Sequence, residues 1–318
     1  MARYLVTGAS GFIGTHLIRK LVSDGVDVVA VDWKEPREKL SGVEYHLLDI
    51  RALSSQAFVG RIDRIYNLAA VHTTPGHQPY EYYETNVSGA VEVTRLAEAL
   101  DIPEIVFTSS ISVYGPSEDM KTEISTPTPV SDYGHSKFLA EQIHRQWLDR
   151  GLSRKLTIVR PAVVFGPGER GNFTRLAQLL KRGFFFFPGR KDTIKACIYV
   201  SDLIDAIAFA HSRSERYVLF NGAYPNRYTL DDIVSVMISD HFKAARAFLV
   251  PRAMLTIAAQ ALGPLGFLNI GIHPERVSKL VRSTDVYPDW LVENGFAFTP
   301  TLAEVFDKWR LDTRGTFV

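Results

Sequence analysis

The stretch TGASGFIG, residues 7–14, decides the fold. It follows a short apolar run, RYLVT at 3–7, and leads into a segment with helical periodicity at 12–23. A second strand-like run, VDVVAV, comes next at 26–31. The order of strand, glycine-rich loop, helix and strand predicts a βαβ unit, which is the context that a dinucleotide-binding fingerprint requires.

The glycines of this loop have a chemical purpose. Gly8, Gly11 and Gly14 permit a tight turn and let backbone N–H groups approach an anion at the start of the helix, where Phe12 and Ile13 lie. A side chain at these positions would hold a pyrophosphate away. Because tight turns without a ligand also use glycine, the flanking strand and helix carry the prediction.

Asp32 stands at the end of the second strand, 18 residues after Gly14. There its carboxylate is placed to accept hydrogen bonds from a ribose diol, and it would repel a 2′-phosphate, so it favours NAD over NADP. Lys34 and Arg37 lie nearby and soften this preference. The alternative is an aspartate that only forms a turn after the strand.

Strands and helices continue to alternate along the chain. We predict a strand from 61 to 67 and slightly beyond, a helix at 86–100, a strand at 104–110, a helix after Tyr133 and a strand at 155–165. Such alternation indicates an α/β protein with a doubly wound parallel sheet covered on both faces, a Rossmann fold.

The pattern of predicted elements changes after FGPG at 165–168, where shorter elements and aromatic turns such as GFFFFPG (183–189) begin. We therefore expect a Rossmann domain at 1–165 and a smaller substrate-binding region at 166–318. The runs at 196–200 and 217–222 resemble strands that rejoin the sheet or flank it, so the two regions are expected to interleave around 195–225. For the four phenylalanines, a place in the core is favoured over stacking on a base.

Composition bounds the function. The 318 residues are 46% hydrophobic and 22% charged with a net charge of +1, which fits a soluble globular protein and disfavours nucleic-acid binding. A single cysteine, Cys197, excludes an internal disulfide framework and fits a reducing cytosol. The first residues lack the pattern of a signal peptide. We expect a cytoplasmic location.

One apolar segment weakly favours contact with a membrane. Residues 253–272 contain only three polar side chains, which is nearly the apolar length of a membrane span. Gly263 and Pro264 interrupt it in the middle. We favour a pair of short helices that is buried or covers the substrate, and we disfavour membrane contact.

Six motifs in order identify a family resemblance. They are TGASGFIG, LDIR at 48–51, NLAA at 67–70, FTSSISVYG at 107–115, YGHSK at 133–137 and RPAVVFGPG at 160–168. Together they resemble an extended short-chain dehydrogenase/reductase of the NAD-dependent epimerase/dehydratase family, the group that contains UDP-galactose 4-epimerase. The resemblance is dense over the first 170 residues and loose beyond them.

The resemblance implies further contacts with NAD. Asp49 and Ile50 would hold the adenine, and Asn86 would lie on the helix beside the cofactor. The remaining residues expected in the cofactor cleft are Leu68, Ala69, Ala70, Thr108 and Ala162. The alternatives are that Asp49 only caps a turn, that the alanines only permit close packing, and that Asn86 is a helix N-cap.

In YGHSK, Tyr133 and Lys137 lie one helical turn apart. A free tyrosine has a pKa near 10, so it is a poor base at neutral pH; a cation on the same helix face stabilises the phenolate. We predict that Tyr133 is the general acid/base for a sugar hydroxyl and that Lys137 tunes its pKa and binds the cofactor ribose. The resemblance implies that Ser110, which matches the family's catalytic Ser/Thr position, hydrogen-bonds the same substrate oxygen. The alternative is a half-buried tyrosine beside a solvated lysine.

The chain lacks catalytic residues that some reactions of the family require, which reduces the number of reactions to consider. The family's 4,6-dehydratases carry an Asp-Glu pair after the active-site threonine, whereas this chain has SSISVYG at 109–115, without carboxylates. The Cys/His pair of 3,5-epimerase-reductases is not evident either. A 4-epimerase, which returns the hydride to the other face, and a 4-ketoreductase, which delivers it once, remain, because both use the same residues.

The resemblance also suggests a nucleotide-sugar substrate, most readily a UDP-sugar. Ser112, Asn172, Lys195 and Arg276 are the further candidate contacts, in addition to Ser110. Lys195 replaces an arginine of the family, so one charge stands in for a bidentate fork. For Arg276 the alternative is a solvated helix face. No metal site is expected.

Two other functions stay open from the sequence. A hydroxysteroid- or flavonoid-type dehydrogenase fits RPAVVFGPG and the apolar segment 253–272. A non-catalytic dinucleotide-binding sensor is disfavoured because Ser110, Tyr133 and Lys137 are all present. The resemblance further implies a homodimer in which the helices at 86–100 and 134–149 pack as a four-helix bundle.

Overall fold

The computed structural model describes residues 2–73, 76–251 and 281–318. Its central feature is a seven-stranded sheet in the order β11-β7-β5-β4-β1-β2-β3, and every neighbouring pair is parallel. The strands are β1 (Arg3–Thr7), β2 (Asp27–Asp32), β3 (Val43–Leu47), β4 (Arg64–Asn67), β5 (Glu104–Thr108), β7 (Lys155–Pro161) and β11 (Tyr217–Gly222). The predicted doubly wound Rossmann sheet is confirmed.

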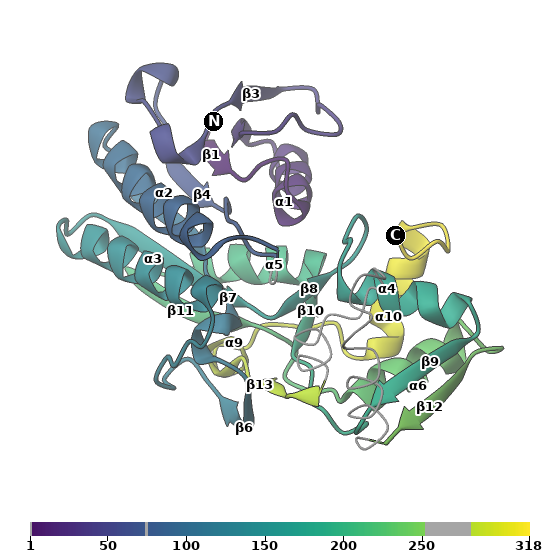
Figure 1. Ribbon diagram of the computed structural model, residues 1–318. Coiled ribbons are helices and arrows are strands. Elements are labelled where there is room, and N and C mark those ends of the chain that lie inside the picture. Colours follow the sequence, from purple (N-terminus) through teal and green to yellow (C-terminus); the bar gives the residue numbers. More distant parts are fainter. Residues whose placement is uncertain (1, 74–75, 252–280) are drawn as a thin grey trace.

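Helices cover both faces of this sheet (Figure 1). One face carries α2 (Pro79–Ala99) and α3 (Asp132–Asp149), and the other carries α1 (Phe12–Ser23) and α5 (Val200–His211). Neighbouring strand residues therefore enter different cores. Leu5 packs with the α2/α3 side and Val6 with the α1/α5 side, and both are fully buried.

Two predicted elements differ most from the observed ones, while β4 begins three residues later and β5 ends two residues earlier than predicted. Helix α2 begins at Pro79, seven residues before the predicted start, because Pro79 suits the first helical turn and Gln78 forms a capping box with Glu81. The predicted strand at 155–165 is divided: β7 ends at Pro161, where the Ala162 N–H bonds the Gly222 carbonyl. The chain then enters β8 (Val163–Phe165), which pairs with a different strand.

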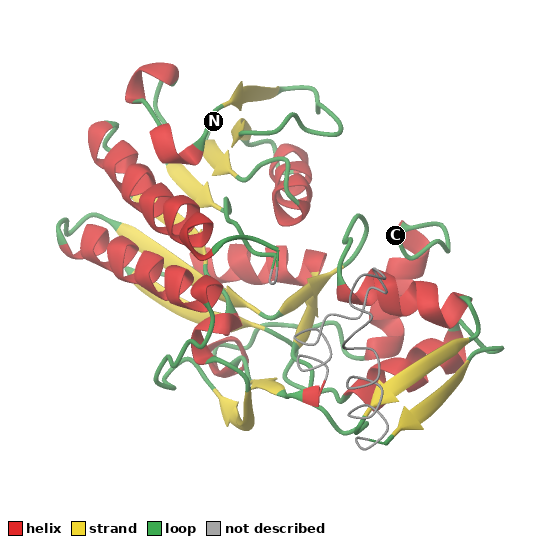
Figure 2. Ribbon diagram, viewed as in Figure 1, coloured by secondary structure: helices red, strands yellow, loops and turns green. Residues whose placement is uncertain are grey.

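The remaining elements form three small parallel pairs and a group of helices (Figure 2). The pairs are β8 with β10 (Cys197–Tyr199), β9 (Phe184–Pro188) with β12 (Arg246–Val250), and β6 (Ser117–Lys121) with β13 (Thr284–Val286). The helices are α4 (Asn172–Lys181), α6 (Leu230–Asp240), α9 (Asp289–Glu293) and α10 (Leu302–Asp312). Three short 3₁₀ turns span Ile50–Ala52, Ser55–Ala57 and Ile111–Tyr114.

The two strand-like runs after residue 195 take different places. Strand β11 rejoins the central sheet beside β7, whereas β10 flanks it in the pair with β8. In GFFFFPG, Phe185 and Phe187 enter the core, but Phe184 and Phe186 face solvent, so the prediction of a core location holds for two of the four. Strand alternation is the reason.

The described residues contain neither a membrane-spanning helix nor a cluster of metal ligands. No helix there is long and apolar enough to cross a membrane. No group of three or more His, Cys, Asp or Glu side chains in that part of the chain is arranged to hold a metal ion. Cys197 is buried, and burial raises the pKa of its thiol to about 12.

Candidate active site

The glycine loop lies at the carboxyl edge of the sheet, where β1 and β4 are neighbours and the connections diverge to opposite sides. Gly8 has φ of +70°, and a Cβ on it would stand 2.6 Å from the Ala69 nitrogen. A Cβ on Gly14 would stand 2.2 Å from the Gly8 carbonyl oxygen. Only glycine fits at these two positions, so the loop and the chain after β4 lie in close contact.

The loop leaves the start of α1 open to an anion. Gly11 is the N-cap of α1 and makes no side-chain capping bond, while Phe12 and Ile13 are the first two residues of the helix and partly buried. The first N–H groups of a helix have no partner within it and carry partial positive charge. This arrangement fits the pyrophosphate of a dinucleotide.

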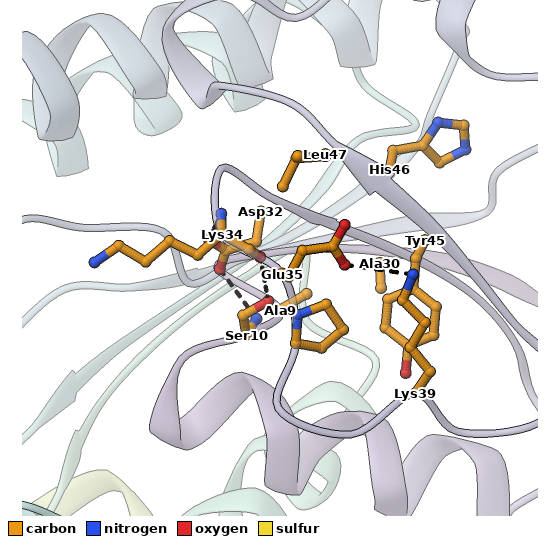
Figure 3. Close-up of a pocket in the computed structure, with 11 residues that line it drawn as sticks. Ala9, Ser10, Ala30, Asp32, Lys34, Glu35, Lys39, Tyr45, His46 and Leu47 are labelled. Carbon is orange, nitrogen blue, oxygen red and sulfur yellow. Dashed lines mark hydrogen bonds and ion pairs between the residues drawn. The ribbon is translucent and has the colours of Figure 1, made fainter.

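The carboxylate of Asp32 accepts hydrogen bonds from the Ser10 N–H at 3.0 Å and the Lys34 N–H at 2.9 Å. The bond from the Lys34 N–H is the one expected if Asp32 only forms a turn after the strand. Asp32 also lines a surface pocket between the glycine loop and the β2–β3 connection, together with Tyr45 and Leu47 (Figure 3). Its carboxylate is thus held in place at the edge where a ribose would lie.

Asp49 makes the contacts of a capping residue. It accepts a hydrogen bond from the Arg51 N–H at 2.9 Å, and its ion pair with the Arg51 guanidinium lowers the pKa of the carboxyl. Ile50 is buried and packs against α2 at Gly89, where an added Cβ would come within 3.1 Å of it. The contacts of Asp49 among the described residues are therefore those of the turn-capping alternative.

Asn86 holds the loop that follows β4. Its Oδ1 accepts a hydrogen bond from the Val71 N–H at 3.0 Å, and its Nδ2 donates to the Val71 carbonyl at 3.1 Å and to Ser136 Oγ at 2.9 Å. Because Asn86 lies inside α2, it is not an N-cap. Its bonds to Val71 hold the preceding residues Leu68, Ala69 and Ala70 in place. Its bond to Ser136 joins this loop to α3.

The predicted catalytic residues gather at the carboxyl end of β5. Lys137 is 2% exposed, and its Nζ donates a hydrogen bond to the Thr108 carbonyl at 2.8 Å. Ser110 is buried at the start of a 3₁₀ turn, where its Oγ accepts from the Ser112 N–H at 3.1 Å. Tyr133 is half-buried at the start of α3 and hydrogen-bonds with Ser110.

The electrostatics differ from the expected pattern. Burial raises the pKa of Tyr133, and the hydrogen bond with Ser110 acts in the opposite direction. Burial lowers the pKa of Lys137 to about 7, against the attraction of Glu141. Burial rather than the lysine charge therefore has the larger effect on the pKa of the Tyr133 phenol.

A buried polar network beneath the site was missed from the sequence. Glu141 and Arg160 form an ion pair at 2.6 Å with both side chains at most 4% exposed, and Ser109 Oγ donates to the same carboxylate. Arg160 also donates to the Tyr114 hydroxyl at 2.7 Å, which donates in turn to Asn221 Oδ1 at 2.9 Å. Arg160 within the apolar run of β7 was the available signal, since a charge in a buried strand needs a partner.

A second buried group lies under β1 and β4. His144 Nδ1 donates to the Ala140 carbonyl at 2.7 Å, so its Nε2 is the atom that accepts from Asn67 Nδ2 at 3.3 Å. Thr7 Oγ1 donates to Asn67 Oδ1 at 2.9 Å. Burial lowers the pKa of His144 to about 4, so the ring is neutral and structural.

The predicted substrate contacts occupy separate places. Asn172 is exposed and is the first residue of α4. In the same first turn, the Thr174 N–H donates a hydrogen bond to the Glu169 carboxylate at 2.9 Å. Lys195 Nζ donates to the Arg282 carbonyl at 2.6 Å, and burial lowers its pKa to about 8. Ser112 and Ala162 are half-buried at the sheet edge, and Arg276 lies outside the described residues.

Comparisons with known proteins agree with this architecture. The model of the NAD dependent epimerase/dehydratase family matches residues 4–221. An N-acetyl-alpha-D-glucosaminyl-diphospho-ditrans,octacis-undecaprenol 4-epimerase of Escherichia coli O157:H7 is 26% identical over 309 residues, covering 96% of this chain and 93% of its own.

Two solved structures share the fold over nearly the whole chain. MoeE5 in complex with UDP-glucose and NAD has a TM-score of 0.76 at 22% identity and covers 100% of both chains. The UDP-glucose 4-epimerase of Thermotoga maritima with UDP-glucose has a TM-score of 0.78 at 19% identity and covers 99% of this chain and 100% of its own.

Proposed function

Because the chain belongs to the NAD dependent epimerase/dehydratase family, we propose that it is an NAD-dependent enzyme that inverts C4 of a sugar 1-diphosphate. The observation that carries the proposal is the meeting of Ser110, Tyr133 and Lys137 at the edge of the sheet that also holds the glycine loop. A 4-ketoreductase uses the same groups and is distinguished by the assay below.

Several features support NAD as the cofactor. The glycine cradle at Gly8 and Gly14 and the uncapped start of α1 fit a pyrophosphate, and the Asp32 carboxylate fits an unphosphorylated ribose. When bound, NAD supplies the hydride acceptance and return at the sugar carbon that no side chain of the protein supplies. The contacts of Asp49 and Ile50 with the adenine belong to this proposal.

Tyr133 holds the proton in the proposed reaction. As the phenolate, its oxygen takes the proton of the C4 hydroxyl as the ketone forms, and the resulting phenol returns that proton after the keto-sugar has turned its other face. Ser110 hydrogen-bonds Tyr133 and is buried beside it, so it can orient the same substrate oxygen. A positive charge at Lys137 lowers the energy of the phenolate, which offsets the cost of burying it.

The diphosphate carrier is proposed to be a nucleotide, most readily uridine. MoeE5 was solved with UDP-glucose, whereas the E. coli relative is named for a lipid-linked substrate; both carry a sugar on a diphosphate. Asn172 at the start of α4, Lys195 and Arg276 are the candidate contacts for that group. We also propose a cytoplasmic homodimer.

A panel of sugar diphosphates tests the proposal. Purified protein is incubated with UDP-glucose, UDP-N-acetylglucosamine and a short polyprenyl-diphospho-N-acetylglucosamine, and product stereochemistry and NADH absorbance are followed. A C4 epimer without net NADH change is the expected result. Stoichiometric NADH loss with a keto-sugar would identify a reductase, and turnover confined to the polyprenyl substrate would replace the nucleotide carrier.

Tyr133→Phe should lower kcat by about 10²-fold to 10⁴-fold while NAD still binds, because only the proton-transferring oxygen is removed. Tyr217→Phe is the matched control, since Tyr217 lies at the amino end of β11, on the opposite edge of the sheet. Turnover by Tyr133→Phe close to that of the control would refute the assigned role.

A further inference from the structure

The outer face of the β9–β12 pair carries exposed aromatic side chains. Phe184, Phe186 and Phe248 are 41%, 51% and 52% exposed. Phe185 and Phe187 point to the other face of β9 and are buried, so the core is filled without the outer rings. The outward aromatic residues therefore have no packing role in the described part of the fold.

These side chains form one continuous surface. Phe186 and Phe248 are paired in the parallel register, with ring centroids 5.8 Å apart, and the ring of Phe184 lies 5.5 Å from that of Phe186. Single exposed apolar residues are common on proteins, but a contiguous group of large ones marks an interaction site. We call Phe184, Phe186 and Phe248 the aromatic patch.

Four cations border one end of the aromatic patch. Lys181 is the last residue of α4, and Arg182 follows it shortly before β9 begins. Lys243 lies three residues before β12, whose first residue, Arg246, is paired in register with Phe184. All four are exposed, and none forms an ion pair with a described residue, whereas Arg190 on the other end of β9 pairs with Glu118 and Asp192. We call these four residues the basic rim.

We propose that the aromatic patch and the basic rim bind the surface of an anionic lipid bilayer. Aromatic side chains settle at the boundary between headgroups and acyl chains, and each nearby lysine or arginine gains attraction to anionic headgroups. The rim and patch are adjacent on one short sheet, so both can engage one plane.

The charge pattern favours a bilayer over a second copy of the chain. In a two-fold contact through this face, the same patch and rim would meet themselves, and unpaired cations would be brought near like charges. An anionic membrane instead complements the rim and accepts the rings. This binding would be peripheral, through the surface of one short sheet.

The aromatic patch is not the apolar segment that was considered as a membrane span in the sequence. Residues 253–272 include no member of the patch, and they lie outside the described residues. The three members of the patch are divided between strands more than 60 residues apart in the chain, so no sequence window displays them together. The proposal therefore revises the expectation that the protein avoids membranes.

Vesicle flotation tests the proposal with the full chain. Vesicles of phosphatidylcholine containing about one-third phosphatidylglycerol should carry the protein, and pure phosphatidylcholine vesicles should carry much less. Phe186→Ser with Phe248→Ser should lower the partition coefficient by about tenfold or more, and Lys181→Gln with Arg246→Gln should weaken binding and its salt dependence. Val59→Ser with Leu311→Ser is the matched control, because both residues are exposed elsewhere.

Two further measurements keep the outcome decisive. Thermal unfolding and NAD binding report that each variant is folded, and neither depends on vesicles or on the proposed sugar substrate. Absence of flotation with anionic vesicles, or equal loss in the control variant, would overturn the proposal. So would a concentration-dependent increase in mass that the Phe186/Phe248 variant abolishes without any vesicle binding, because it would identify a second copy as the occupant.

Discussion

Lys137 is a residue whose burial has a direct consequence for pH dependence. Its ammonium is enclosed at the carboxyl end of β5 with the Thr108 carbonyl as its hydrogen-bond acceptor and the Phe107 ring 4.8 Å away. Burial lowers its pKa from 10.5 to about 7, so above neutral pH the folded protein holds fewer protons at this site than the unfolded chain. The stability contributed by this site therefore rises with pH between about 7 and 10.5.

Lys137→Met should remove that contribution. Urea unfolding of the protein without added cofactor is measured at the two ends of this pH window for both forms. The gain in free energy of unfolding with rising pH should be smaller in the variant, because methionine fills the space without binding a proton. Equal gains in both forms would show that the Lys137 ammonium is not destabilised by its burial.

At the scale of elements, the Glu141–Arg160 ion pair joins α3 to β7. Removing one partner of a buried pair leaves the other charge unpaired in the interior, which costs about 3–5 kcal/mol. Arg160→Met should therefore lower the free energy of unfolding by about that amount, measured by urea denaturation.

The double variant Glu141→Leu with Arg160→Met separates this charge effect from a loss of packing. Once Glu141 is gone, no carboxylate is stranded, so the arginine substitution should cost much less than in the natural background. The same cost in both backgrounds would mean that Arg160 stabilises the sheet by its packing alone.

Elements were predictable where one local pattern controls them. TGASGFIG places β1, the loop and α1, because the close approaches of Gly8 and Gly14 are already required by the turn. The early start of α2 was not predicted, since it depends on the Gln78 capping box rather than on apolar periodicity. The turn of β8 out of the sheet depends on the partner strand β10, which lies more than 30 residues further along.

For the candidate site, sequence motifs identify the groups but not their environment. The spacing of Tyr133 and Lys137 predicts that they share a helix face, yet burial, which sets the pKa of both, depends on β5 and the chain after β4. Likewise, Asn86 could be predicted to lie near the cofactor, whereas its hydrogen bonds to Val71 require the folded loop. Contacts that join distant segments carry no local signal.

At the scale of the whole molecule, α2 and α3 lie together on one side of the sheet with their outer faces exposed (Figure 1). Val91 and Leu139, each 45% exposed, lie near the middle of these faces. The proposed four-helix dimer would bury both, so Val91→Glu with Leu139→Glu should place four carboxylates in the interface and convert the dimer to a monomer. Sedimentation velocity measures the change; Val59→Glu, which lies outside both helices, should leave the mass unchanged, and a dimer that persists in the double variant would exclude this interface.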